Sequence, residues 1–174
     1  MPYAMVPIFT QTVGAGGATS ITFNNIPSNY TDLKILFSAR ATPGATRWGM
    51  YYRFNSDSST TYSYTSINGY DSGSYQSPRG SNATSAGEAV VDGDTATANT
   101  FSNNELYIPN YSASIFKQIV TDYFAENNST SAWMNGMGAS LWRNTASINS
   151  ITIAPNSGNF VQNSTFTLYG IKNA

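Results

Sequence analysis

The chain has 174 residues, of which 40% are hydrophobic and 10% are charged, with a net charge of −1. This length fits one domain with a single core. Eight basic residues spread singly leave no basic stripe for phosphates, so nucleic-acid binding is not expected. The absence of histidine and cysteine removes the commonest general base, thiolate nucleophiles and the usual metal ligands. We therefore expect no enzymatic activity and no cofactor.

The N-terminal segment, residues 1–18, is apolar and free of charge. It is either a docking arm for a partner or an ordinary first strand, and both interpretations stay open. Its candidate contact residues are Tyr3, Met5, Val6, Ile8 and Phe9. The segment lacks the charged start of a secretion signal, which predicts synthesis in a cytoplasm without export by the general route. No apolar run approaches the ~18 residues that span a bilayer, so we expect no membrane insertion.

Two stretches alternate apolar and polar residues with a period of two, which is typical of half-buried strands. In residues 31–40 one face carries Leu33, Ile35, Phe37 and Ala39, and the other carries Asp32, Lys34, Ser38 and Arg40. The turn dipeptide Pro43-Gly44 follows. In residues 47–55 the inner face carries Trp48, Met50, Tyr52 and Phe54. Together these stretches predict two neighbouring strands with aliphatic and aromatic inner faces.

Weaker strand patterns occur along the rest of the chain. They are centred on Ile21 and Phe23, on Tyr62 and Tyr64, on Leu106 and Ile108, on residues 151–155, and on Phe166 and Leu168. Residues 114–125 fit a strand or a short helix, and β-branched and aromatic residues favour the strand. Residues 132–142 contain glycine too often for a helix. We predict an all-β protein of about eight to ten strands, an antiparallel, jelly-roll-like β-sandwich covering residues 19–174 as a single domain.

Residues 68–88 are polar and rich in glycine and serine, which predicts a long surface loop. Four tyrosines lie around it and are candidate glycan or inter-subunit contacts: Tyr62, Tyr64, Tyr70 and Tyr75. Aromatic faces and hydroxyl donors suit carbohydrate. Tyrosine is equally common in sandwich cores and at subunit interfaces.

The acidic residues form no recognisable catalytic or metal-binding motif. Asp92-Gly93-Asp94 offers two carboxylates to calcium, but the same tripeptide is an ordinary turn signal. We therefore interpret the acidic side chains as turn formers and solvated surface groups, and we expect neither catalytic residues nor a metal site.

Three stretches carry a resemblance to a known family: "IPSNYTDLKILFSAR", "ATANTFSNNELYIPNY" and "SGNFVQNSTFTLYGIKNA". Together they resemble small β-rich virion surface proteins of tailed bacteriophages, especially marine and cyanobacterial ones. The resemblance implies a capsid decoration (cement) protein, often a homotrimer, with the major capsid protein or tail components as partners. The alternative that it implies is a tail-fibre or tail-tip module that binds host-surface glycan. It also implies synthesis in the host cytoplasm and location on the virion surface, and it supplies no catalytic residue.

Overall fold

The computed structural model describes residues 4–71, 73–129 and 132–172. Within these ranges the chain forms thirteen strands, and no residue belongs to a helix that could cross a membrane. The larger sheet has the order β1 (Ala4–Thr12), β13 (Thr165–Lys172), β3 (Asp32–Ala39), β9 (Ser102–Ile108), β10 (Lys117–Ala125), β11 (Met134–Trp142), β5 (Tyr62–Tyr70) and β6 (Ser74–Gln76), and β7 (Arg79–Ala83) also pairs with β5. The smaller sheet has the order β2 (Ile21–Phe23), β12 (Ile151–Pro155), β4 (Arg47–Phe54) and β8 (Ala86–Asp92).

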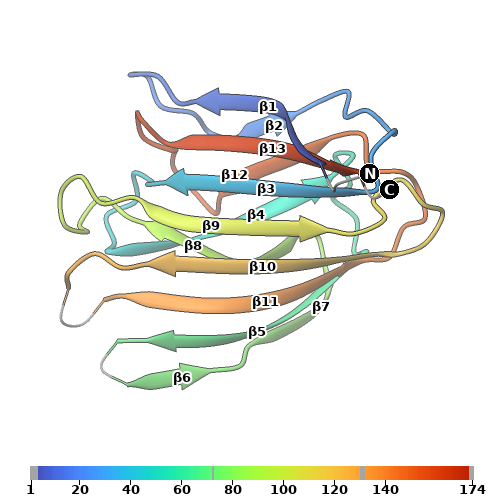
Figure 1. Cartoon of the computed structure of the whole chain (residues 1–174). Coiled ribbons are helices and arrows are strands. Elements are labelled where there is room, and N and C mark those ends of the chain that lie inside the picture. Colours follow the sequence, from blue (N-terminus) through green and yellow to red (C-terminus); the bar gives the residue numbers. More distant parts are fainter. Residues whose placement is uncertain (1–3, 72, 130–131, 173–174) are drawn as a thin grey trace.

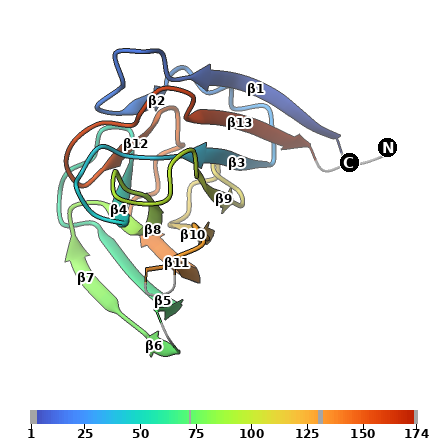
Figure 2. The ribbon, with the colours of Figure 1, turned by 90° about the vertical axis from the view of Figure 1, so that its left-hand side faces the viewer.

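The two sheets pack face to face, with the smaller sheet behind the larger one in Figure 1 and beside it in Figure 2. All neighbouring strands of both sheets run antiparallel. The predicted all-β antiparallel sandwich is therefore confirmed.

Alternation explains the core where the two strongest strand patterns lie. Leu33, Ile35 and Phe37 of β3 are buried as predicted, and the Phe37 ring stacks on Phe166 of β13 at 5.2 Å between centroids. The inner face of β4 is also confirmed, with Met50, Tyr52 and Phe54 in the core and Trp48 packed partly against it. Burying one such side chain contributes roughly 1.5–3 kcal/mol, so these inward faces hold the two sheets together.

Two residues predicted to face solvent are buried instead: Asp32 is 4% exposed and Arg40 is 8% exposed. Asp32 begins β3 and Arg40 directly follows its last residue, and both side chains hold neighbouring loops. Asp32 accepts hydrogen bonds from the Tyr107 hydroxyl and the Asn110 backbone N–H. The Arg40 guanidinium donates to four backbone carbonyls, those of Asp94, Ala96, Thr97 and Thr100. Alternation fails at strand ends because the loops there supply polar partners.

The prediction of a long loop over residues 68–88 is wrong. The segment contains the end of β5, all of β6 and β7, and the start of β8. Strands β6 and β7 form one interrupted sheet edge, and at the interruption the Pro78 carbonyl accepts the backbone N–H of Ser66. Because an edge strand can expose both faces, it needs no apolar alternation, and its sequence resembles a loop.

Most non-glycine residues with a left-handed backbone in the described ranges are asparagines: Asn25, Asn55, Asn82, Asn99, Asn110, Asn128 and Asn163. Asparagine tolerates this conformation better than other side chains do. The abundance of asparagine in this chain therefore has a structural explanation in its turns.

Candidate functional site

The outward surface of the larger sheet carries apolar side chains on β5, β10 and β11. Ile67 is 63% exposed, Met137 59%, Phe124 49% and Val120 48%. Strand register places Met137 directly opposite Ile67, and Val120 directly opposite Ala139. We call Ile67, Val120 and Met137 the outer patch. Isolated exposed apolar residues are ordinary, but neighbouring ones on adjacent strands mark a contact surface.

The inward surface of the same three strands includes several buried polar residues. Ser66, Asn68, Thr121 and Ser140 are buried there, behind strand β8. The Tyr52 and Thr121 hydroxyls lie 2.6 Å apart, and the Tyr123 hydroxyl donates to Oδ1 of Asn68. Hydrogen bonding compensates the burial of these groups. In this half of the sheet, polar residues share the inward face with the buried rings of Tyr62, Tyr123 and Trp142, while further large apolar residues are exposed on the outward face.

Two carboxylates lie directly opposite each other beside the outer patch. Glu105 of β9 pairs in register with Asp122 of β10, and Asp122 pairs in turn with Met137 of β11. The Lys34 ammonium lies 2.7 Å from Oε1 of Glu105. Opposed like charges destabilise a sheet, and Lys34 relieves that cost only in part. This acidic pair gives the apolar surface a negatively charged border.

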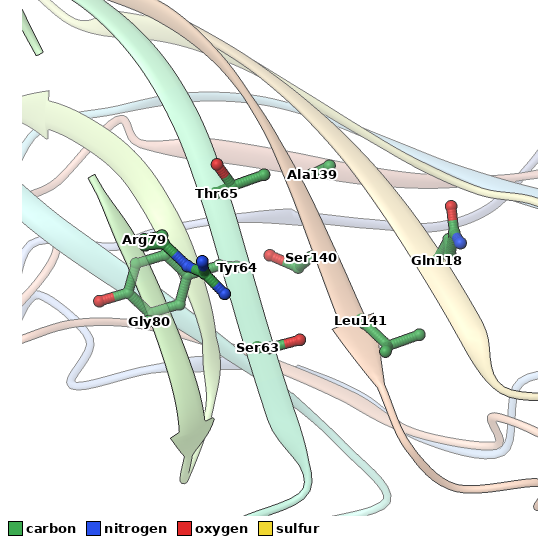
Figure 3. A pocket seen from close by; sticks show the side chains of 9 residues that line it. All are labelled: Ser63, Tyr64, Thr65, Arg79, Gly80, Gln118, Ala139, Ser140 and Leu141. Atoms are coloured by element: carbon green, nitrogen blue, oxygen red, sulfur yellow. The ribbon is translucent and has the colours of Figure 1, made fainter. Parts of the chain in front are cut away.

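Two open hollows join on this surface. One, of about 510 Å³, is lined by the outer patch together with Thr65, Asp122 and Ala139. The other, of about 400 Å³, shares Thr65 and Ala139 and extends to Arg79, Gln118 and Leu141. Figure 3 shows the second hollow, with Arg79 of β7 next to Tyr64 of β5, and with Gln118 on β10, beyond β11. The surface is a broad trough and not an enclosed active-site cleft.

The predicted docking segment forms the edge strand β1, which pairs with β13 along its length. Met5 and Val6 are exposed, at 48% and 42%. Ile8 and Phe9 pack against the core, and the Phe9 ring stacks on Phe23 at 6.1 Å. Tyr3 lies outside the described residues. Residues 4–12 of the segment are therefore a strand of the larger sheet and not a detached arm, and the docking role of Met5 and Val6 stays a prediction.

The four predicted tyrosines do not gather at one site. Tyr62 is fully buried, so its prediction as a surface contact is wrong. Its hydroxyl accepts the Phe54 N–H at 3.1 Å and donates to the Asp57 carbonyl at 3.2 Å. Burial raises the pKa of Tyr62 to about 12. The residue is part of the core because its ring packs against Phe54 and Trp142.

The other three tyrosines lie nearer the surface. Tyr64 is half-buried beside Gly80. The Arg47 guanidinium lies 5.3 Å from the centre of the Tyr70 ring, and the same guanidinium forms an ion pair with Asp71 at 2.6 Å. Tyr75 on β6 is 82% exposed. Of the predicted residues, Tyr75 is the one whose ring is most open to a ligand.

Sequence reasoning missed the neighbours of Tyr75. Asn135 and Trp133 meet Tyr75 over Gly69, where a Cβ would lie 2.9 Å from Asn135 Oδ1 and 3.8 Å from each ring. A hollow of about 340 Å³ adjoins them, lined by Phe124, Glu126, Trp133 and Asn135 among others. We call Tyr75, Phe124, Trp133 and Asn135 the aromatic corner. The signal in the sequence was weak, because the residues come from three strands whose register cannot be seen in the chain order.

The buried ionisable groups have structural roles. The Lys117 ammonium donates to the carbonyls of Ile115 at 2.6 Å and Ala146 at 2.9 Å, and burial lowers its pKa. Burial raises the pKa of Asp92, and hydrogen bonds from Asn127 and Thr100 partly offset that rise. Among the residues that the structure describes, no group of three or more histidine, cysteine or acidic residues could hold a metal ion.

Comparisons with known proteins show no family for this chain. No family model and no curated protein matches the sequence. Among solved structures, the crystal structure of Caenorhabditis elegans galectin LEC-6 is similar over 94% of this chain and 96% of that chain. The TM-score is 0.32 and the sequence identity is 7%. A likeness at this level carries no inference about function.

Proposed function

We propose that the chain is a non-catalytic structural protein of a bacteriophage virion, a capsid decoration protein that binds the major capsid protein through the outer patch. The observation that carries the proposal is the exposed apolar surface of β5, β10 and β11, where Ile67, Val120 and Met137 are open to solvent although the inward face of the same strands already packs in the core. The resemblance to small phage surface proteins supports a location on a virus particle. Synthesis in the host cytoplasm and a final location on the virion surface are part of the same proposal.

The chemistry of the outer patch defines the partner surface. Ile67 and Met137 lie opposite each other, so a partner needs an apolar surface over both side chains. Asp122 borders them, so a Lys or Arg on the partner would complement the carboxylate. One such contact is weak, but a particle presents many equivalent copies, and simultaneous contacts raise the overall affinity.

The open edge of β1 is proposed to join three protomers into a homotrimer. β1 pairs with β13 on one side, and Met5 and Val6 are exposed along the strand. An edge strand can accept a strand or an apolar side chain from a neighbouring copy. A trimer built through β1 would leave the outer patch, on the sheet surface, available to the capsid.

Copy number in purified particles tests the proposal most directly. We expect quantitative mass spectrometry of particles of the phage that encodes the chain to find copies on the order of hundreds, as a decoration protein on a symmetric shell requires. A few copies would contradict decoration and favour a tail location. Complete absence from particles would contradict a virion role.

Binding to undecorated heads tests the role of the outer patch. We expect Ile67→Lys combined with Met137→Lys to abolish co-sedimentation with heads, because two ammonium groups would be buried in an apolar contact. Gln162→Lys adds a positive charge at another exposed position and serves as the matched control. Circular dichroism and thermal melting should show that both variants are folded. Full binding by the double variant would exclude the patch as the capsid contact.

A second candidate function is a tail-associated module that binds host-surface glycan. The aromatic corner favours it, because Tyr75 is exposed beside Trp133 and Asn135. The two functions use different parts of the same sheet surface.

A further inference from the structure

We infer that the aromatic corner is a binding site for a neutral saccharide. It lies where the C-terminal ends of β5 and β10 meet the N-terminal ends of β6 and β11. The site is next to the outer patch but distinct from it. Its rings are those of Tyr75, Phe124 and Trp133, and its polar groups are the Asn135 amide and the Glu126 carboxylate. The inference does not rest on the virion assignment, because it concerns the isolated chain.

Strand pairing brings these side chains together from distant parts of the sequence. Phe124 of β10 pairs with Asn135 of β11, Asn135 pairs with Gly69 of β5, and Gly69 pairs with Tyr75 of β6. The four positions form one row across four strands. Trp133 immediately precedes β11, and its carbonyl accepts the backbone N–H of Asp71 at 3.3 Å, which ties it to the end of β5.

Gly69 leaves room for the centre of the aromatic corner. A Cβ at this position would lie 2.9 Å from Asn135 Oδ1 and 3.8 Å from atoms of both Trp133 and Tyr75. The Asn135 amide therefore lies over the glycine, with one aromatic ring near each side. Any larger residue at position 69 would displace that amide.

The lining matches the two kinds of surface that a pyranose presents. Axial C–H groups form an apolar face that packs against an aromatic ring, and Trp133 and Phe124 both line the hollow. The equatorial hydroxyls need donors and acceptors, which the Asn135 amide and the Glu126 carboxylate supply. Oε1 of Glu126 accepts the Asn128 backbone N–H at 2.9 Å, so the carboxylate is already oriented. The hollow, at about 340 Å³, has room for one or two sugar residues.

The charge at the site selects among saccharides. Glu126 lines the hollow, and Asp122 lies two positions before Phe124 on the same outward surface of β10. An acidic sugar would meet repulsion from the two carboxylates. The ligand class is therefore a neutral hexose or N-acetylhexosamine unit.

Titration of the isolated chain, followed by NMR, tests the inference. The probes are the methyl glycosides of glucose, galactose, mannose and N-acetylglucosamine, with methyl glucuronide as the acidic comparison. We expect at least one neutral glycoside to shift the Trp133 indole and Asn135 side-chain amide signals, and saturation transfer to reach its axial C–H protons. No shift with any neutral glycoside at tens of millimolar, or equal binding of the glucuronide, would overturn the inference.

Variants locate the site. Trp133→Ala and Gly69→Ala should each weaken binding about tenfold or more, the first by removing a ring and the second by displacing the Asn135 amide. Trp133→Phe retains a ring and should retain most of the affinity. Tyr51→Ala is the matched control, because Tyr51 lines a different hollow with Tyr64 and Asn82. Loss of binding in Tyr51→Ala, with full binding in Trp133→Ala, would place the saccharide elsewhere and overturn the assignment.

Discussion

The two halves of the larger sheet differ in where they place large apolar residues: the half around β3 buries them on its inward face, and the half around β11 has them on both faces. In β3 the inward residues are Leu33 and Ile35, and Lys34 between them faces outward. In β5 the inward residues include Ser66 and Asn68, and Ile67 between them is 63% exposed. One chain thus contains both the usual arrangement of a half-buried sheet and, at residues 66–68 of β5, its local reverse.

The difference shows which half of the sheet contributes most of the apolar burial and which half exposes large apolar residues to solvent. The half formed by β13, β3 and β9 is held by apolar burial, with stacked Phe37 and Phe166 between the sheets. The half formed by β10, β11 and β5 is held inside by a few large rings and by hydrogen bonds such as that between Tyr123 and Asn68. Its outward apolar residues are expected to add little to monomer stability, and under the proposed function they contact another molecule.

The largest loss of stability is expected from a substitution in the half formed by β13, β3 and β9. Phe37→Ala should lower the free energy of unfolding by about 3–5 kcal/mol, because it removes a buried ring that stacks on Phe166. Urea unfolding followed by tryptophan fluorescence measures the change. Lys34→Ala, on the outward face of the same strand, is the control and should cost far less. A loss below about 1 kcal/mol for Phe37→Ala would contradict the assignment of this half to the apolar core.

A smaller loss is expected from the polar interior of the other half. Asn68→Ala removes an acceptor of the buried Tyr123 hydroxyl and should cost about 1–3 kcal/mol. Combining it with Tyr123→Phe forms a double-mutant cycle, in which a favourable coupling energy is expected between the two side chains. Additive losses would show that the hydrogen bond contributes nothing to stability, and that packing alone holds this half.

The pH dependence of stability tests the burial of the hydroxyl of Tyr62, the first residue of β5. Burial raises its pKa from the ordinary value of 10.0 to about 12. The neutral phenol is therefore favoured by folding, and its contribution is complete below pH 10.0 and is lost as the pH rises through about 12. Tyr62→Phe should remove this component, so the difference in unfolding free energy between the variant and the parent should change with pH in that window and stay constant below it. A constant difference across the window would contradict the burial of the hydroxyl.

The two halves of the larger sheet also differ in how well their structure could be predicted from the sequence. The inward faces of β3 and β4 were predicted residue by residue, because a strand with one buried face must alternate. The sandwich architecture followed from those strands and from the absence of helix signals. In β5 the same alternation placed Tyr62 and Tyr64 together correctly, but it did not reveal that Ile67 faces solvent while Asn68 is buried. Hydropathy alone therefore assigns the wrong faces to Ile67 and Asn68.

The candidate sites required information that no single stretch contains. The outer patch depends on the pairing of Ile67 with Met137, 70 residues later in the chain (137 − 67). The aromatic corner depends on a row across four strands and on the space above Gly69. The edge strands β6 and β7 resembled a loop because their polar residues carry no burial pattern. Register, and not composition, creates both surfaces.

The smallest stability effects are expected on the outer patch, where they separate contact from folding. Val120→Ala and Met137→Ala should each change the unfolding free energy of the monomer by less than about 0.5 kcal/mol, because both side chains are about half exposed or more, at 48% and 59%. The same variants should weaken co-sedimentation with heads, since the apolar area they lose would be buried only in the complex. Denaturant unfolding at low protein concentration measures the unfolding free energy of the monomer alone. A loss of stability comparable with that of Asn68→Ala would mean that these residues support the fold itself, and that the outer patch is not a surface kept for a partner.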